Sequence, residues 1–177
     1  MQSRFLFLLF MLFPCLSHLK GESNIGKPFP HIYVESLSGQ AREFPGKTGE
    51  LILIGFEKDC VPMLKGWVEV LTRQKLLSKN VEIYTLSVLG TSWKARVFRP
   101  LTIRMIKSKV PVQGHGRTFL LTQNQEVMET FFGGGNNKVL PEAYLVLIDK
   151  KGIVRWQHTG AVTEAAKSTL RTAANNL

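Results

Sequence analysis

The sequence predicts a single α/β domain in which helices cover both faces of a mixed β-sheet. Two apolar runs, 51–56 and 143–148, lack the alternation of a half-exposed strand and are typical of strands buried on both faces. Over residues 61–77, large apolar side chains recur every three or four positions, which predicts a helix with one buried stripe. The 177 residues, 44% of them hydrophobic, suffice for one such domain and a short extension.

Turn signals and periodicity predict the remaining elements. A Ser38-Gly39 turn separates two short strands and predicts a hairpin. Pro100 lies inside a helical pattern, so we expect that helix to be broken. Thr163 is expected to cap the last helix. The expected elements are strands at 31–37, 40–44, 51–56 and 81–88, helices at 61–77, 93–109 and 123–132, a short strand within 110–121, an antiparallel pair at 143–148 and 153–158, and a final helix ending near 174.

Residues 1–20 are typical of a signal peptide. The apolar run at 5–16 is interrupted only by Pro14, and it is shorter than the about 20 apolar residues that span a bilayer. Ser17 is a candidate for the small residue before a cleavage site. We therefore expect export by a periplasmic or secretory route and a folded domain at 25–177, with a short hydrophobic membrane anchor as the alternative for the first segment.

The net charge of +10 is concentrated in one quarter of the chain. No acidic residue occurs between Glu82 and Glu126. The same stretch holds seven basic residues: Lys94, Arg96, Arg99, Arg104, Lys107, Lys109 and Arg117. Such a stretch predicts an acidic or membrane-associated polypeptide client, or an anionic membrane surface, with a solvated face that binds nothing specific as the alternative. Nucleic acid is not expected, because no RNP-type motif, zinc finger or aromatic ladder accompanies these residues.

The cysteine and histidine content argues against a metal centre or a cofactor. Two cysteines, Cys15 and Cys60, cannot build a dense disulfide scaffold or a four-thiolate site. Bulky Phe13 and Pro14 precede Cys15, so we do not expect lipidation, and removal of the first segment would leave Cys60 as the only thiol. His115 has no second ligand at motif spacing and is expected to be solvated.

Three segments, 25–30, 56–63 and 140–152, resemble the first segment, the active-site loop and the cis-proline hairpin of thioredoxin-like redoxins. The resemblance covers nearly all of 25–177. It implies a thioredoxin-like three-layer fold, with a mixed central sheet, helices on both faces, and a C-terminal antiparallel hairpin plus helix. Residues 149–164 are also similar to the mitochondrial ATP synthase assembly-factor family. That similarity implies a mitochondrial location and a membrane subunit of an ATP synthase as an alternative client.

The resemblance makes Cys60 and Met63 the decisive residues of the site. Redox members of the family carry two thiols at positions i and i+3 on the first helical turn, and the second resolves the mixed disulfide that the first forms. Here the two positions hold Cys60 and Met63. A thioether neither ionises nor resolves a disulfide, so one copy of the chain is not expected to perform dithiol exchange.

Cys60 has two possible roles. A single thiol would form a mixed disulfide with a partner, be oxidised to a sulfenic acid, or link two copies; a packing thiol would be buried and inert. Asp59 favours the packing role, since a nearby negative charge disfavours a thiolate. Peroxidase and copper-carrying variants of the fold are not expected. The Pro and Thr of the peroxidase would fall at Leu53 and Glu57, and the second Cys of the copper carrier at Leu64.

The resemblance also implies a polypeptide-binding surface around Pro141. A cis-proline there would place the backbone of Leu140 beside Cys60, where it pairs with an extended polypeptide through main-chain hydrogen bonds. The alternative is a trans proline that opens a strand. Pro62 and Met63 are assigned to the same binding surface.

Two pairs of residues carry further expectations. Arg155 and Trp156 are expected either to face a partner or to stack on each other. Trp67 and Trp93 are expected to pack in the core. The favoured function is a polypeptide-binding assembly or chaperone-type factor without catalysis. The alternative is a single-cysteine thiol-disulfide oxidoreductase, or a peroxidase-like redox protein, that uses an external resolving thiol.

Overall fold

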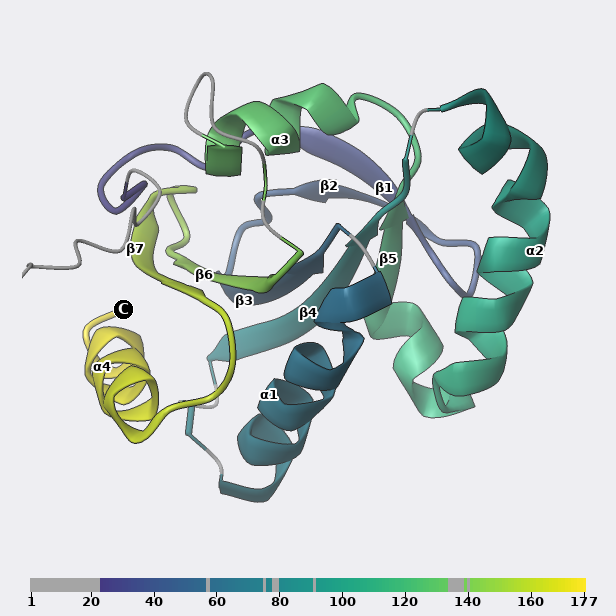
Figure 1. Ribbon diagram of the computed structural model, residues 1–177. Helices are drawn as coiled ribbons and strands as arrows, with labels where there is room; N and C mark the ends of the chain where they lie inside the picture. The colour runs from purple at the N-terminus through teal and green to yellow at the C-terminus, as the bar shows by residue number, and fades with distance from the viewer. Residues whose placement is uncertain are drawn as a thin grey trace, which may run out of the picture.

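The computed structural model describes residues 23–56, 58–74, 76–77, 80–90, 92–133, 139 and 141–177, so the predicted signal segment lies outside it. The described residues form a seven-stranded mixed sheet with strand order β2-β1-β5-β4-β3-β6-β7 (Figure 1). Its strands are β1 (Ile32–Ser36), β2 (Ala41–Phe44), β3 (Gly49–Gly55), β4 (Val81–Val88), β5 (Thr118–Leu121), β6 (Ala143–Ile148) and β7 (Val154–Thr159). Its helices are α1 (Val61–Gln74), α2 (Trp93–Lys109), α3 (Gln125–Gly133) and α4 (Glu164–Asn175), with short 3₁₀ turns η1 (Lys58–Cys60) and η2 (Val112–Arg117).

Strand β3 lies inside the sheet, as its continuous apolar run predicts. It pairs in parallel with β4 and antiparallel with β6, so that Leu53 faces Thr85 on one side and Leu145 on the other. Strands β4 and β5 are parallel, and β6–β7, β1–β2 and β1–β5 are antiparallel. The sheet is therefore mixed, with parallel strands at its centre and antiparallel pairs at its edges.

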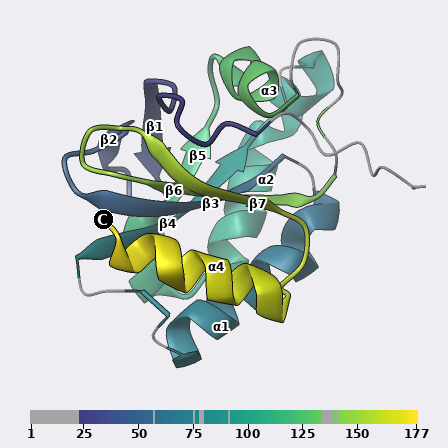
Figure 2. The same cartoon turned by 90° about the vertical axis from the view of Figure 1, so that its left-hand side faces the viewer.

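Two apolar clusters cover the two faces of the sheet. Side chains of successive strand residues point to opposite faces, so Leu51 and Leu53 enter one cluster while Ile52 and Ile54 enter the other. Helix α3 packs on the face of Ile52, and helices α1 and α4 pack on the face of Leu51. Figures 1 and 2 show this arrangement, with α3 above the sheet and α1 and α4 below it. Helices on both faces were predicted, and the structure confirms them.

Most of the predicted elements occur within a few residues of their expected bounds. The predicted hairpin is formed by β1 and β2, and the predicted C-terminal hairpin by β6 and β7. The helix predicted over 61–77 ends earlier, at Gln74. Thr163 caps α4 as expected, because its side-chain oxygen accepts a hydrogen bond from the backbone N–H of Ala166 at 3.1 Å.

Helix α2 corrects one expectation. It is continuous from Trp93 to Lys109 with Pro100 inside it, whereas the sequence predicts a broken helix. Proline removes one intrahelical donor, but α2 buries none of its residues and Pro100 is exposed. The carbonyl that loses its intrahelical donor can therefore bond to water, which makes the interruption tolerable.

Two side chains near α2 also differ from expectation. Trp67 is buried as predicted, but Trp93 is 70% exposed, because α2 turns this residue away from the sheet. His115 is half-buried rather than fully solvated. Its Nε2 lies 3.0 Å from the carbonyl oxygen of Val110 and 3.2 Å from that of Lys107, so the ring sits against the last turn of α2.

Among the residues that the structure describes, none of the helices combines the length and the apolar character that a bilayer crossing requires.

Candidate functional site

Cys60 lies just beyond the carboxyl end of β3, at the start of α1. The strand ends at Gly55, the 3₁₀ turn η1 ends at Cys60, and α1 begins at Val61. The Cys60 side chain is 1% exposed and belongs to the apolar cluster that also contains Trp67 and Ala143. The thiol is therefore packed against the sheet at the position where α1 leaves it.

Met63 lies on the first turn of α1, three residues after Cys60. This spacing places the two side chains on the same face of the helix start. Met63 is half-buried and packs against the same apolar cluster as Cys60. Pro62 is exposed, in the first helical turn, where a missing backbone N–H costs little. The thioether of Met63 thus fills space beside the start of α1, three residues after the thiol.

The start of β6 lies beside the end of β3. Gly55 pairs with Ala143 in antiparallel register. Exposed Pro141, two residues before Ala143, therefore lies at the same end of the strands as Cys60. Leu140 lies outside the described residues, and with it the Leu140–Pro141 peptide bond. The cis configuration at Pro141 therefore stays a prediction.

At this end of the strands, hydrogen bonds connect parts of the chain that are far apart in the sequence. The Trp67 indole N–H donates to the carbonyl oxygen of Gly160 at 3.1 Å. The Gly160 backbone N–H donates to the carbonyl oxygen of Ala143 at 2.8 Å. Gly160 has φ +99°, a conformation that favours glycine, so the loop after β7 can turn tightly enough to make both contacts. Helix α1, the end of β7 and the start of β6 are therefore fixed relative to one another around Cys60.

Arg155 and Trp156 point to opposite faces of β7 and do not stack on each other. Trp156 is 6% exposed, and its indole N–H donates to Thr169 Oγ1 at 3.0 Å. Its ring stacks on His158, with ring centroids 5.8 Å apart and an interplanar angle of 15°. Trp156 is therefore a packing residue between β7 and α4, and strand alternation is the reason that it separates from Arg155.

Arg155 lies near the start of β7, at the opposite end of the strands from Cys60. Its guanidinium pairs with Asp149, the residue after β6, with Nη2 2.6 Å from Oδ2. Both residues line an open hollow of about 710 Å³ between the β6–β7 turn and the end of α4. The structure thus groups Cys60, Pro62, Met63 and Pro141 at one end of the strands and places Arg155 at the other end.

The Asp149 carboxylate organises the β6–β7 turn. Partial burial favours its neutral form, but hydrogen bonds from the Ile153 N–H, the Arg155 guanidinium and the Lys151 N–H outweigh this effect and lower the pKa of Asp149. The two backbone N–H groups donate to Oδ1 at 3.0 and 2.8 Å, and Arg155 Nε donates to Oδ2 at 2.7 Å. A charged carboxylate with these partners is the usual device for closing a tight turn.

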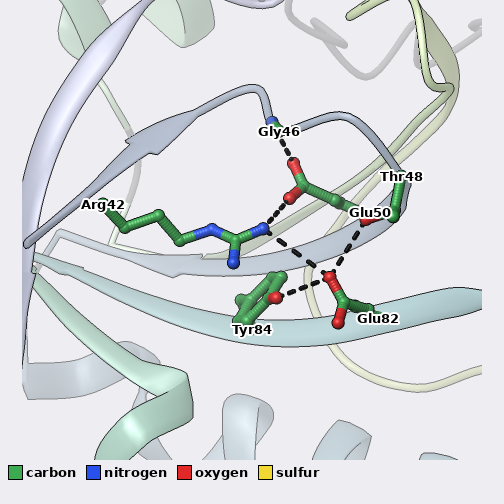
Figure 3. Close-up of polar contacts among 6 residues, drawn as sticks. All are labelled: Arg42, Gly46, Thr48, Glu50, Glu82 and Tyr84. Atoms are coloured by element: carbon green, nitrogen blue, oxygen red, sulfur yellow. Dashed lines mark hydrogen bonds and ion pairs between the residues drawn. The ribbon is translucent and has the colours of Figure 1, made fainter. Parts of the chain in front are cut away.

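A second charged cluster lies at the amino end of β3, away from Cys60. Glu50 is completely buried, and its carboxylate pairs with Arg42 from β2 and accepts a hydrogen bond from the Gly46 N–H at 2.9 Å (Figure 3). The Arg42 guanidinium also lies over the Tyr84 ring, 4.3 Å from its centroid. The cluster ties β2 and the loop after it to the centre of the sheet, so its role is structural.

Glu82 forms the solvent side of this cluster. The Tyr84 hydroxyl donates to Glu82 Oε2 at 2.7 Å and the Thr48 hydroxyl at 3.0 Å, as Figure 3 shows. The hydrogen bond from Tyr84 lowers the pKa of Glu82, burial opposes this effect, and the bond from Thr48 and the charge of Arg42 add to it. Burial, followed by the hydrogen bond to Glu82, raises the pKa of Tyr84 to about 12.

Sequence reasoning missed Gly55 as a residue of the site. A Cβ atom placed on Gly55 would lie 2.5 Å from Cys60 Sγ, so the thiol occupies the space that any side chain would need. The available signal was a lone glycine inside an otherwise apolar strand, a pattern typical of close approach by another group. Within the described parts of the chain, no group of three or more His, Cys, Asp or Glu side chains is placed to hold a metal ion.

No protein-family model and no curated protein sequence matches this chain. Solved structures do match it in fold. A Sco-family protein, BsSco, described as a member of a family of cytochrome c oxidase assembly proteins, is 14% identical with a TM-score of 0.57, covering 87% of this chain and 97% of its own. A thiol:disulfide interchange protein of the thioredoxin family from Chlorobium tepidum is 12% identical with a TM-score of 0.54, covering 86% and 99%.

A third similar structure is an exposed lipoprotein thioredoxin from Streptococcus pneumoniae. It is 11% identical with a TM-score of 0.50, covering 84% of this chain and all of its own. Nearly the full length of each of these proteins superposes on this chain. The chain therefore has a thioredoxin-like fold, as the three resembling segments predict.

Proposed function

We propose that the chain is a polypeptide-binding assembly or chaperone-type factor that keeps the thioredoxin-like framework but performs no dithiol exchange. The observation that carries this proposal is the pair formed by Cys60 and Met63. Met63 stands three residues after the thiol on the first turn of α1 and packs into the apolar cluster. A methylated sulfur at that position cannot release a mixed disulfide, so a covalently trapped substrate would not turn over.

The end of the strands beside Cys60 supports binding rather than catalysis. Pro62 and Pro141 are both exposed there, so an extended polypeptide can reach the main chain around them, where the prolines themselves offer carbonyl acceptors only. The 1% exposure of Cys60 restricts access of small reagents to its sulfur. A similar fold is described for a family of cytochrome c oxidase assembly proteins, which supports an assembly role for this framework.

The alternative function is that of a single-cysteine thiol-disulfide oxidoreductase with an external resolving thiol. The position of Cys60 immediately before α1 favours it, because a helix N-terminus stabilises a thiolate. The similarity to a thiol:disulfide interchange protein supports the same function. Burial of the sulfur and the missing second thiol speak for the binding function instead.

Export also remains a proposal. The hydrophobic segment at 1–20 supports it, and so does the similarity to a thioredoxin described as an exposed lipoprotein. Mass spectrometry of the chain recovered from an exporting host would show a new N-terminus near Ser17. An intact N-terminus, or import into isolated mitochondria, would favour the anchor or the mitochondrial alternative.

Restoring the second thiol tests the main proposal. We expect no reduction of insulin disulfides by the natural chain and measurable reduction by the Met63→Cys variant, since α1 already places residue 63 near Cys60. Met63→Ser is the matched control and should stay inactive. Turnover by the natural chain without an added thiol would refute the proposal, whereas turnover only with added glutathione would establish the single-cysteine alternative.

Crosslinking tests the binding half of the proposal. A photoreactive amino acid at exposed position 62 should capture the same polypeptide clients in the natural chain and in a Cys60→Ser variant. Loss of all clients in Cys60→Ser would show that the thiol itself is the function. The same probe at exposed Tyr33, far along the sheet in β1, serves as the control for capture without specificity.

A further inference from the structure

Helix α2 displays apolar side chains to solvent over most of its length. Five of its large apolar residues are at least half exposed: Trp93 at 70%, Val97 at 63%, Phe98 at 57%, Leu101 at 61% and Met105 at 50%. None of the 17 residues of α2 is buried. An isolated exposed leucine needs no explanation, but a contiguous apolar stripe on a helix is typical of a surface that binds a partner.

The helical period gathers these residues on the outer face. Trp93, Val97, Leu101 and Met105 follow one another at spacings of four, so their side chains form one stripe. The half-buried residues of α2, such as Ala95, Ile103 and Ile106, occupy the other side. Arg99 belongs to that inner side, where its guanidinium donates to the carbonyl oxygen of Thr122 at 3.2 Å. The inner side therefore attaches α2 to the domain, and the exposed apolar stripe faces away from it. Figure 1 shows α2 at the margin of the fold.

Basic residues lie among the apolar ones on the same outer face. Lys94 is three residues before Val97, Arg104 is three after Leu101, and Lys109 is four after Met105, so each neighbours the stripe. All three are exposed, and α2 has no acidic residue. The Lys94 Nζ lies 5.9 Å from the centroid of the Trp93 ring, which shows how closely charge and apolar surface are mixed.

We propose that α2 is an interfacial helix that lies in the surface of an anionic lipid bilayer. Its apolar stripe would enter the boundary between headgroups and acyl chains, and its lysines and arginines would meet acidic headgroups. Lys and Arg suit this place because their aliphatic stems lie in apolar surroundings while their charges reach the headgroups. At about 1.5 Å per residue the 17-residue helix is about 25 Å long, and its five basic residues other than Arg99 keep it in the plane of the membrane.

Charge complementarity favours a membrane over an acidic protein helix. A partner helix is recognised through an apolar seam with charges at its margins, whereas α2 has charge and apolar groups interleaved across the same face. A bilayer surface satisfies both at every point along the helix. Exposed Trp93 and Phe98 are residue types that favour the membrane interface.

Vesicle flotation and tryptophan fluorescence test the proposal with the full chain. The three tryptophans all belong to the described residues, and only Trp93 is exposed, since Trp67 and Trp156 are buried. We expect the chain to float with vesicles of phosphatidylcholine and phosphatidylserine but not with phosphatidylcholine alone, and to bind less at high salt. Its fluorescence should shift to the blue on binding, and Trp93→Phe should abolish the shift.

Matched double variants distinguish α2 from any other lipid-binding segment. Leu101→Gln combined with Met105→Gln should weaken vesicle binding by about tenfold or more. Tyr33→Gln combined with Val68→Gln removes two exposed apolar side chains outside α2 and should bind as the natural chain does. Equal binding by the α2 variant would refute the proposal and assign binding elsewhere, such as the segment at 1–20. Absence of vesicle binding, with capture of an acidic amphipathic peptide by α2, would refute it in favour of a protein partner.

Discussion

The backbone of Gly55 lies directly against the sulfur of Cys60. A side chain at position 55 would begin 2.5 Å from Cys60 Sγ and 2.9 Å from Leu64 Cδ1. Gly55 is paired with Ser87 on one side and Ala143 on the other, so its backbone cannot move aside without breaking the sheet. The buried position of the thiol thus depends on the absence of a side chain at the end of β3.

We expect Gly55→Ala to push Cys60 out of its packing position. The variant should lose about 1–3 kcal/mol in free energy of unfolding, as overpacked cores do. Its Cys60 should react faster with a neutral alkylating reagent, because the displaced thiol is less well covered. Urea denaturation and labelling rates measure the two effects.

Gly66→Ala is the matched control for this prediction. Gly66 lies inside α1, and its nearest neighbour to a new Cβ would be Val162 Cγ2 at 3.8 Å, an ordinary contact. Alanine in a helix interior should raise the free energy of unfolding by about 0.5–1 kcal/mol. Equal effects of the two substitutions would show that Cys60 does not oppose a side chain at position 55.

Because Arg42 and Glu50 contact each other, we expect substitutions of these two residues to change the free energy of unfolding in a strongly non-additive way. Arg42→Met would leave the completely buried Glu50 carboxylate with the Gly46 N–H as its remaining described hydrogen-bond donor. An uncompensated buried charge costs about 3–5 kcal/mol, so we expect a loss in this range. Chemical denaturation of the purified variant measures it.

The double variant Arg42→Met with Glu50→Gln completes a thermodynamic cycle. Removing the charge of Glu50 should recover part of the loss caused by Arg42→Met, giving a coupling of about 1–3 kcal/mol. Glu82→Gln, whose charge is 48% exposed, should cost less than either single change in the pair. Additive effects would mean that Arg42 and Glu50 do not stabilise each other.

We expect the ionised Asp149 carboxylate to stabilise the fold at neutral pH and to lose this contribution in acid. Because the folded state lowers the pKa of Asp149, the carboxylate stabilises the fold above its ordinary pKa of about 3.9, and this contribution disappears as the pH falls through the folded-state value. Asp149→Asn should therefore destabilise at neutral pH by about 1–2 kcal/mol, since water screens the 48% exposed Arg155. The difference from the natural chain should shrink below about pH 4.

Denaturation across a pH series checks this expectation. Glu69→Gln is the control, because Glu69 forms an exposed pair with Arg73 on α1 and should change stability by less than about 0.5 kcal/mol. A difference between Asp149→Asn and the natural chain that stays constant from neutral pH into acid would contradict the role assigned to the carboxylate.

Tyr84 predicts a loss of stability in alkali. Its raised pKa of about 12 means that the folded state keeps the hydroxyl protonated after the unfolded chain begins to ionise near pH 10. The stabilising contribution is complete below about pH 10 and is lost as the pH rises toward 12. The difference in phenolate absorbance between the natural chain and Tyr84→Phe should appear near pH 12; a difference centred near the ordinary pKa would contradict the contact with Glu82.

Much of the fold could be predicted because its main signals are local. The apolar runs of β3 and β6 identify strands buried on both faces, and the periodicity after Val61 identifies α1. Pro100 misled the prediction for α2, since the cost of a proline depends on whether the freed carbonyl meets water. The prediction that Trp93 packs in the core was wrong for a related reason. Whether a large apolar side chain is covered depends on which element packs over it, and neighbouring residues do not specify that element.

The sequence by itself determined the order of strands and helices, the presence of Met63 three residues after Cys60 and the concentration of positive charge before Glu126. These are properties of neighbouring residues, so they can be read along the chain. Only the tertiary structure decided that Cys60 packs against Gly55, that Pro141 lies at the same end of the strands while Arg155 does not, and that α2 presents its apolar stripe to solvent. Each of these depends on strand register and helix placement, which arise from contacts between residues far apart in the sequence.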